Sequence, residues 1–188
     1  MIEVIEPGLY MTLQDFGRFG YLSKGLTRGG PADEHAFLWA NKLVGNRFDA
    51  AQLEITLGGA RIRFTEPTHF SVCGADAKLS LDEQPLNSWQ SHSAIAGQTL
   101  HIGQAQAGLR IYLAVAGGFQ AEPQWGSVAT VAREKIGGIH QNGHPLKSGT
   151  TLNTEKSTAD IDRRVPWQYR PDYSKTPTLG LIPGNQYE

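Results

Sequence analysis

Short stretches in which apolar and polar residues alternate recur through the first 120 residues of the chain. In 52–57, Leu53, Ile55 and Leu57 fall on one side and polar residues on the other, which is the period of a strand with one buried face. Similar stretches, separated by glycine and proline turns, predict strands at 2–5, 9–13, 60–64, 69–73, 77–81, 99–102 and 110–116. Strands at intervals of roughly 8–12 residues are typical of a barrel, so we expect a mainly β, closed or nearly closed β-barrel.

One segment, 33–44, instead has its apolar residues at the spacing of an amphipathic helix. These apolar positions are Ala36, Phe37, Ala40, Leu43 and Val44. Asp33 stands where an N-cap residue belongs, and Gly45 stands where a glycine usually ends a helix. Because the N-terminus of a helix also attracts anions, two interpretations of Asp33 stay open: it caps the helix, or it faces a ligand.

The last quarter of the chain has a different composition. Residues 151–177 are polar and contain several prolines, which is typical of a linker or of an extended arm on the surface. A new apolar stretch at 178–182 predicts a strand just before the sequence ends. We therefore expect a β-barrel domain at 1–150, a linker or arm at 151–177, and the start of a truncated second lobe at 178–188.

Composition excludes several classes of protein. The net charge is −1, whereas a nucleic-acid-binding surface usually shows as a basic excess. The sequence has no apolar run long enough to cross a membrane and does not begin like a signal peptide. The single cysteine, Cys73, excludes an intramolecular disulfide and fits a reducing compartment. A cytoplasmic protein is therefore expected.

The first candidate for chemistry is the loop that follows the strand at 9–13. It places an amide, a carboxylate and a guanidinium close together, on Gln14, Asp15 and Arg18. The planar fork of an arginine suits a carboxylate or a ureido-like carbonyl, and Asp15 is placed to orient it. An equally good interpretation is an internal Asp15–Arg18 pair that only fixes the loop.

The second candidate is Glu54, which lies between apolar residues of the strand at 52–57. Its side chain is expected to face either solvent, as most glutamates do, or a polar pocket of the barrel. Cys73 also lies at a strand end near His69, but a lone cysteine is more often a small core residue than a nucleophile.

No metal site or phosphate-binding loop is predicted. His140 and His144 are four residues apart, but the sequence between them is a turn rather than a helix, so they do not share a helix face. Neither a dinucleotide-binding glycine motif nor a Walker-type motif is present. If the reaction uses ATP, we expect another polypeptide to bind it.

Several segments together resemble the family of allophanate hydrolase subunit 2, also described as biotin-dependent carboxyltransferase-like proteins. The segments are GLY at 8–10, TLQDFGR at 12–18, GPAD at 30–33, ANKLVGN at 40–46, LEITLG at 53–58, GA at 74–75 and YLAVAGG at 112–118. Within this family the chain is most similar to the C subunits of bacterial ATP-dependent 5-oxoprolinases. The stretch GSVAT at 126–130 departs from the family pattern, because Val128 replaces a basic residue.

The resemblance implies a cyclophilin-like β-barrel and a role in a complex with the A and B subunits of the enzyme, of which the latter is similar to allophanate hydrolase subunit 1. Such a complex cleaves 5-oxoproline to glutamate and hydrolyses ATP, first phosphorylating the lactam carbonyl and then opening the ring with water. Gln14, Arg18 and the backbone of Gly29 and Gly30 are the expected substrate-binding groups, together with Asp33. Asp15 and Glu54 are the expected catalytic residues, which orient these groups or move protons.

Two other functions remain open within the resemblance. One is the carboxyltransferase domain of a urea carboxylase, in which a pocket of this fold accepts biotin and urea. The other is a non-enzymatic regulator that binds a kinase-inhibitor-like partner, as some relatives do. ATP-grasp and biotinyl domains in the whole protein would indicate a urea carboxylase. Binding of the partner without any turnover would indicate a regulator.

Overall fold

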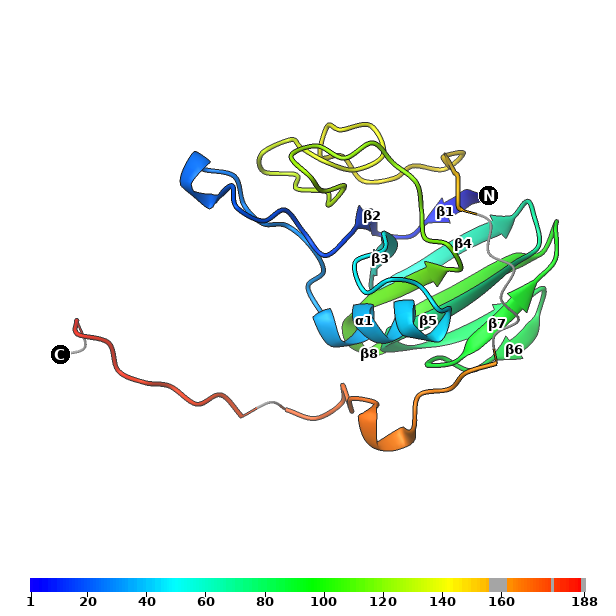
Figure 1. Cartoon of the computed structure of the whole chain (residues 1–188). Coiled ribbons are helices and arrows are strands. Elements are labelled where there is room, and N and C mark those ends of the chain that lie inside the picture. Colours follow the sequence, from blue (N-terminus) through cyan, green and yellow to red (C-terminus); the bar gives the residue numbers. More distant parts are fainter. Residues whose placement is uncertain (156–161, 177, 187–188) are drawn as a thin grey trace.

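The computed structural model describes residues 1–155, 162–176 and 178–186, and in them one antiparallel sheet dominates (Figure 1). Its strands are β1 (Ile2–Pro7), β2 (Tyr10–Gln14), β3 (Gln52–Thr56), β4 (Gly58–Phe64), β5 (Thr68–Leu81), β6 (Gln84–Leu86), β7 (Ser91–Ala94), β8 (Thr99–Val115) and β9 (Thr151–Leu152). The helical elements are α1 (Glu34–Leu43) and the short 3-10 turns η1 (Leu22–Lys24) and η2 (Trp167–Tyr169). A mainly β fold with one amphipathic α-helix is confirmed.

Two long strands, β5 and β8, form the centre of the sheet. β8 pairs with β5 along one edge, and along its other edge it pairs first with β4 and then with β3. β2 continues from β3, β1 and β9 continue from β4, and β6 and β7 pair with β5. The sheet curls into a half-barrel (Figure 1) whose inner side holds the larger apolar core.

The central strands are longer than the sequence predicted, because glycines that indicated turns lie inside them. Gly74 is one example: its φ is +109° and it stands where the register between β5 and β8 shifts. A Cβ atom at this position would collide with the carbonyl oxygen of Arg110. The glycine therefore permits a bulge within one continuous strand rather than ending the strand.

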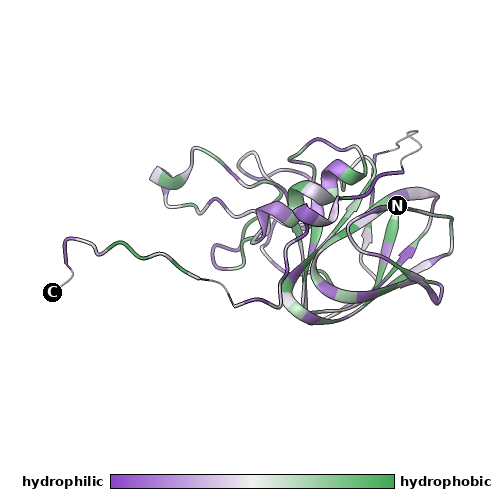
Figure 2. Ribbon diagram, turned by 90° about the horizontal axis from the view of Figure 1, so that it is seen from below, coloured by the Kyte–Doolittle hydropathy of each residue, from purple (hydrophilic) through white to green (hydrophobic). Residues whose placement is uncertain are grey.

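Helix α1 covers one face of the sheet and encloses a second apolar core. Asp33 caps the helix, since its Oδ1 accepts a hydrogen bond from Ala36 N at 3.0 Å. Phe37 and Ala40 are fully buried against a cluster that includes Tyr112 and Cys73. Seen from below in Figure 2, hydrophilic residues colour much of α1, and the strands alternate between hydrophilic and hydrophobic residues. The cap interpretation of Asp33 is confirmed.

One element predicted in the C-terminal part of the chain does not form. The strand predicted at 178–182 is wrong: these residues form no strand, and Leu179, Leu181 and Ile182 are exposed. Within 151–177, β9 pairs with β1, and 162–176 contacts α1. Residues 156–161 and 177 of the expected arm, and the last two residues of the expected second lobe, lie outside the described residues.

Candidate functional site

Arg18 is the most deeply buried of the charged residues expected at the site, with 2% of its surface exposed. Its Nη2 donates a hydrogen bond to Ala129 O at 2.6 Å. Burial lowers the pKa of Arg18, while the negative charge of Asp15 acts in the opposite direction. Its Nε and Nη1 are buried and have no hydrogen-bond partner in the described part of the chain. A buried guanidinium with unused donors is costly unless a further group binds it.

Gln14 ends beside the same backbone and also has an unused polar atom. Its Nε2 donates to Thr12 Oγ1 and to Thr130 O, both at 3.1 Å. Because a carbonyl oxygen such as Thr130 O only accepts, these contacts fix which end of the amide is nitrogen. The other end, Oε1, is buried and has no partner among the described residues. Gln14 therefore has a spare acceptor where Arg18 has spare donors.

Asp15 connects its own loop to the loop at 127–128 by hydrogen bonds. Its Oδ1 accepts hydrogen bonds from Gly17 N at 2.9 Å and from Ser127 Oγ at 2.6 Å, and its Oδ2 accepts from Val128 N at 2.8 Å. No direct ion pair with Arg18 is found in the described residues, so the internal Asp15–Arg18 pair does not form. Val128 contributes only its backbone N–H to this contact. Replacing the basic residue of the family pattern by valine therefore leaves the contact unchanged.

Glycines let the backbone approach the Arg18 guanidinium. Gly29 has φ +65°, and a Cβ atom there would lie 3.1 Å from Arg18 Nη1 and 2.8 Å from Val131 Cγ2. Gly30 lies against the carbonyl of Phe16 instead. Gly137 was not expected at the site, yet a Cβ atom there would lie 2.9 Å from Arg18 Nη2. No local motif marks Gly137, because its closeness to Arg18 exists only after folding.

Glu54 points into the protein, with 6% of its surface exposed, so the solvent-facing interpretation is wrong. Its Oε2 accepts hydrogen bonds from Ala32 N at 2.9 Å and from the Tyr112 hydroxyl at 2.7 Å. Its Oε1 lies 3.7 Å from Arg110 Nε, a distance that makes an ion pair without a hydrogen bond. Burial raises the pKa of Tyr112, and the negative charge of Glu54 raises it further. The hydroxyl therefore stays protonated and can donate its hydrogen bond.

Asp33 joins the Glu54 group rather than the Arg18 group. Its backbone N–H donates to the Tyr112 hydroxyl at 2.8 Å, and its Oδ2 accepts from the Tyr173 hydroxyl at 2.6 Å. Sequence analysis missed both tyrosines. Tyr112 lay in an apolar strand and Tyr173 in a stretch predicted to be a linker, so no signal marked either as a site residue.

Thr12 connects the two groups across the sheet. It stands opposite Glu54 in the pairing of β2 with β3, and Glu54 stands opposite Tyr112 in the pairing of β3 with β8. Directly paired residues of antiparallel strands project from the same face, with Cβ atoms about 4.5–5.5 Å apart. Gln14 donates to Thr12 and to Thr130 O, and Arg18 donates to the neighbouring carbonyl of Ala129. We define Arg18, Gln14, Thr12, Glu54 and Tyr112 as the polar row.

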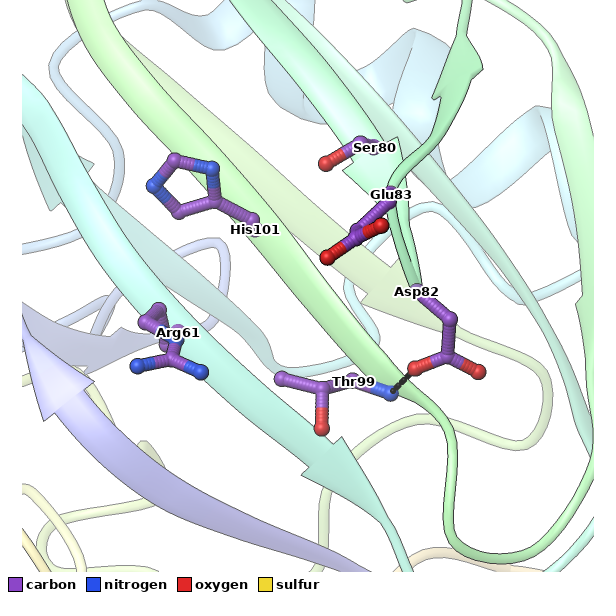
Figure 3. Close-up of a pocket in the computed structure, with 6 residues that line it drawn as sticks. All are labelled: Arg61, Ser80, Asp82, Glu83, Thr99 and His101. Carbon is purple, nitrogen blue, oxygen red and sulfur yellow. Dashed lines mark hydrogen bonds between the residues drawn. The ribbon is translucent and has the colours of Figure 1, made fainter.

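A recess lies away from the polar row, among exposed and half-buried residues of β4, β5 and β8 and of the turn that follows β5 (Figure 3). It has a volume of about 560 Å³ and is lined by Arg61, Ser80, Asp82, Glu83, Thr99 and His101. Arg61 is half-exposed and pairs with Glu6, and Asp82 accepts a hydrogen bond from Thr99 N. Its charged groups thus have solvent or partners available, and the recess makes a weaker candidate than the polar row.

Other sequence candidates do not form a site. Among the described residues, no cluster of three or more histidine, cysteine, aspartate or glutamate side chains is placed to hold a metal ion. Cys73 is 1% exposed, and burial raises the pKa of its thiol well above the usual value. None of the described helices has the length and apolar character needed to cross a membrane.

A known protein family and several known proteins are similar in sequence to this chain. A family model described as "Carboxyltransferase domain, subdomain A and B" matches residues 24–188. The C subunit of the Escherichia coli 5-oxoprolinase is 39% identical over 160 residues, which are 85% of this chain and 51% of that protein. A putative urea carboxylase of Emericella nidulans is 38% identical over 187 residues, which are 97% of this chain and 15% of that protein.

A solved structure has the same fold. The crystal structure of the Kluyveromyces lactis urea carboxylase matches with a TM-score of 0.80 and 30% identity, over 96% of this chain and 16% of that chain. The chain therefore spans about half of the 5-oxoprolinase relative and a small part of the urea carboxylases. These relatives are named as enzymes or as subunits of enzymes.

Proposed function

The chain belongs to the carboxyltransferase-domain family, and on this basis we propose that it is part of the C subunit of an ATP-dependent 5-oxoprolinase. With the A and B subunits, it would form a cytoplasmic complex that cleaves 5-oxoproline to glutamate and hydrolyses ATP. Support for the assignment comes from two relatives that are named as this component of 5-oxoprolinase and are 39% and 34% identical to the chain.

One observation carries the proposal: the unused polar atoms of Gln14 and Arg18 complement an amide. Gln14 Oε1 is a free acceptor, while Arg18 Nε and Nη1 are free donors. A lactam such as 5-oxoproline offers the opposite set, with an N–H donor beside a carbonyl acceptor, and it also has a carboxylate that an arginine binds well. Binding it would satisfy groups that are otherwise buried without partners.

The chain's own residues would then position the substrate and move a proton. Amide resonance makes the lactam carbonyl a poor electrophile, and ATP, held by another polypeptide of the complex, would activate it by phosphorylation. Arg18 would hold the lactam carbonyl oxygen and stabilise the negative charge of the phosphoryl group that is transferred to it. Glu54, with Oε2 held by two donors, would accept through Oε1 a proton from the water that opens the ring. Asp15 would hold the loop at 127–128 in place.

A second function is supported by the extent of one comparison. The relative named putative urea carboxylase matches 97% of this chain, and urea presents the same N–H and carbonyl groups as a lactam. In that case the polar row would belong to a carboxyltransferase domain, and biotin on a separate domain would supply the carboxyl group. The same unused atoms of Gln14 and Arg18 would then bind urea.

A reconstituted complex distinguishes these functions. The full gene product containing this chain is purified with its A and B partners, and glutamate released from 5-oxoproline is measured with and without ATP. We expect ATP-dependent release that disappears when this protein is omitted. A complex without release, but active with urea and a biotinylated carrier, would replace the first proposal by the second. A stable complex inactive with both would favour a regulator.

A further inference from the structure

The segment 162–173 runs along helix α1 from its C-terminal end to its N-terminal end. Arg163 Nη1 donates to Lys42 O at 2.7 Å near the end of the helix. Further along, His35 Nε2 lies 2.8 Å from Tyr169 O. At the start of the helix, the Tyr173 hydroxyl donates to Asp33 Oδ2 at 2.6 Å. Three contacts thus hold the segment against α1, near both ends of the helix.

The segment is also packed where it meets the sheet. Val165 is fully buried, and Arg170 Nε and Nη2 both donate to Val165 O, at 2.9 and 2.8 Å. The ring of Tyr173 lies against Gly108 of β8, where a Cβ atom would be 3.0 Å from the ring. Because a larger residue at 108 would displace this ring, the position of the Tyr173 hydroxyl depends on β8 as well as on α1.

From Tyr173 a continuous set of hydrogen bonds leads to Glu54. Asp33 accepts from Tyr173 through its side chain and donates to the Tyr112 hydroxyl through its backbone. Tyr112 in turn donates to Glu54 Oε2 at 2.7 Å. Ala32, next to Asp33 in the chain, donates its N–H to the same oxygen at 2.9 Å. Any movement of Asp33 therefore changes both donors that hold the Glu54 carboxylate.

We propose that Tyr173 is a positioning residue for Glu54, through which the segment 162–173 sets the orientation of this carboxylate. Tyr173 fixes Asp33, and Asp33 fixes the neighbouring Ala32 N–H and the Tyr112 hydroxyl. These two donors hold Oε2 of Glu54, which leaves Oε1, 3.7 Å from Arg110 Nε, as the oxygen without a hydrogen bond. The segment thus acts on the polar row, although it lies more than 100 residues from Glu54 in sequence. The inference rests on the proposed function for its kinetic readout only.

Hydrogen exchange at single-amide resolution in the assembled complex tests the coupling without any turnover. Tyr173→Phe removes one hydroxyl, and Tyr169→Phe is the matched control, since Tyr169 is in the same segment and half-exposed. We expect Tyr173→Phe to speed exchange of the Ala32 and Asp33 amides by at least about fivefold, and the control to change it by less than about twofold. Unchanged exchange at Ala32, with faster exchange confined to 165–173, would overturn the proposal.

Kinetics test whether the coupling reaches the chemistry. In the complex, Tyr173→Phe is expected to lower kcat for 5-oxoproline about three- to tenfold while KM stays within about twofold, because the substrate-binding groups are unchanged. Faster exchange at Ala32 with a normal kcat would overturn the positioning role. If the wild-type complex releases no glutamate, the 5-oxoprolinase proposal fails, and exchange at Ala32 alone decides whether Tyr173 holds the Glu54 group.

Discussion

The two ends of the polar row differ in how completely their polar atoms are satisfied. At the Arg18 end, Gln14 Oε1 and two guanidinium nitrogens are buried without partners in the described part of the chain. At the Glu54 end, Ala32, Tyr112, Asp33 and Tyr173 form a connected set of hydrogen bonds around one carboxylate oxygen, and one nitrogen, Arg110 Nε, is buried without a hydrogen bond. Hydrogen bonds within the chain therefore hold one oxygen of Glu54, whereas the Arg18 end has more buried donors and acceptors left without partners.

Arg18→Met tests the unsatisfied end and has the largest expected effect. It should reduce glutamate release by at least about tenfold, because each charged hydrogen bond contributes about 1.5–3 kcal/mol. The free energy of unfolding should stay the same or rise, since a buried charge with unused donors is removed. Turnover in the complex and chemical denaturation of the protein measure the two effects.

Arg47→Met is the control for this variant, because Arg47 is exposed and pairs with Asp49 on the surface. It should leave both turnover and stability unchanged. If Arg18→Met instead unfolds the protein or keeps normal turnover, Arg18 is a structural residue.

Tyr112→Phe probes the satisfied end and should act mainly on stability. It leaves Asp33 N–H and one side of Glu54 Oε2 without their partner, which should lower the free energy of unfolding by about 2 kcal/mol. Denaturant unfolding compared with Tyr169→Phe measures this loss. If the free energy of unfolding decreases no more than in the control, water replaces the lost hydroxyl, and the Glu54 end is accessible to solvent.

The dependence of stability on pH gives a second test of the satisfied end. Burial raises the pKa of Tyr112 and of Tyr173, and their carboxylate neighbours act in the same direction. The two protonated hydroxyls therefore stabilise the fold to their full extent at pH values below the tyrosine pKa of the unfolded chain, about 10. This stabilisation is lost as the pH rises above that pKa toward the higher pKa values of the folded protein. Wild-type protein should lose more stability than Tyr112→Phe between about pH 9 and 11.5. Parallel losses in thermal unfolding would contradict this account.

Arg61→Met should have the smallest effect, because it changes only the recess shown in Figure 3. Arg61 is half-exposed and its pair with Glu6 is on the surface, where such pairs contribute about 0–1 kcal/mol. Turnover should not change, and the thermal midpoint should move by no more than about 2 °C. A large loss of turnover would move the candidate site from the polar row to this recess.

Local sequence patterns predicted most of the strands and the helix, but they did not predict all the tertiary contacts. Alternation located most strands, and the cap at Asp33 with Gly45 located the helix to within a residue at each end. The failures have one cause: residues such as Gly74 and the stretch 178–182 were judged without knowing which strands lay beside them. Pairing with β8 kept Gly74 inside a strand, while no neighbour in the described residues pairs with 178–182.

Local sequence was sufficient for the class of fold, the single helix with its cap, and the presence of an amide, a carboxylate and a guanidinium in the loop at Gln14, Asp15 and Arg18. Tertiary contacts were needed to learn that Asp15 binds the loop at 127–128, that Glu54 points inward to Tyr112, and that Tyr173 reaches Asp33. Periodicity reflects which face of a segment is buried, and this is a local property. Hydrogen-bond partners more than 50 residues apart depend on how strands pair and where loops pack, which no local pattern records.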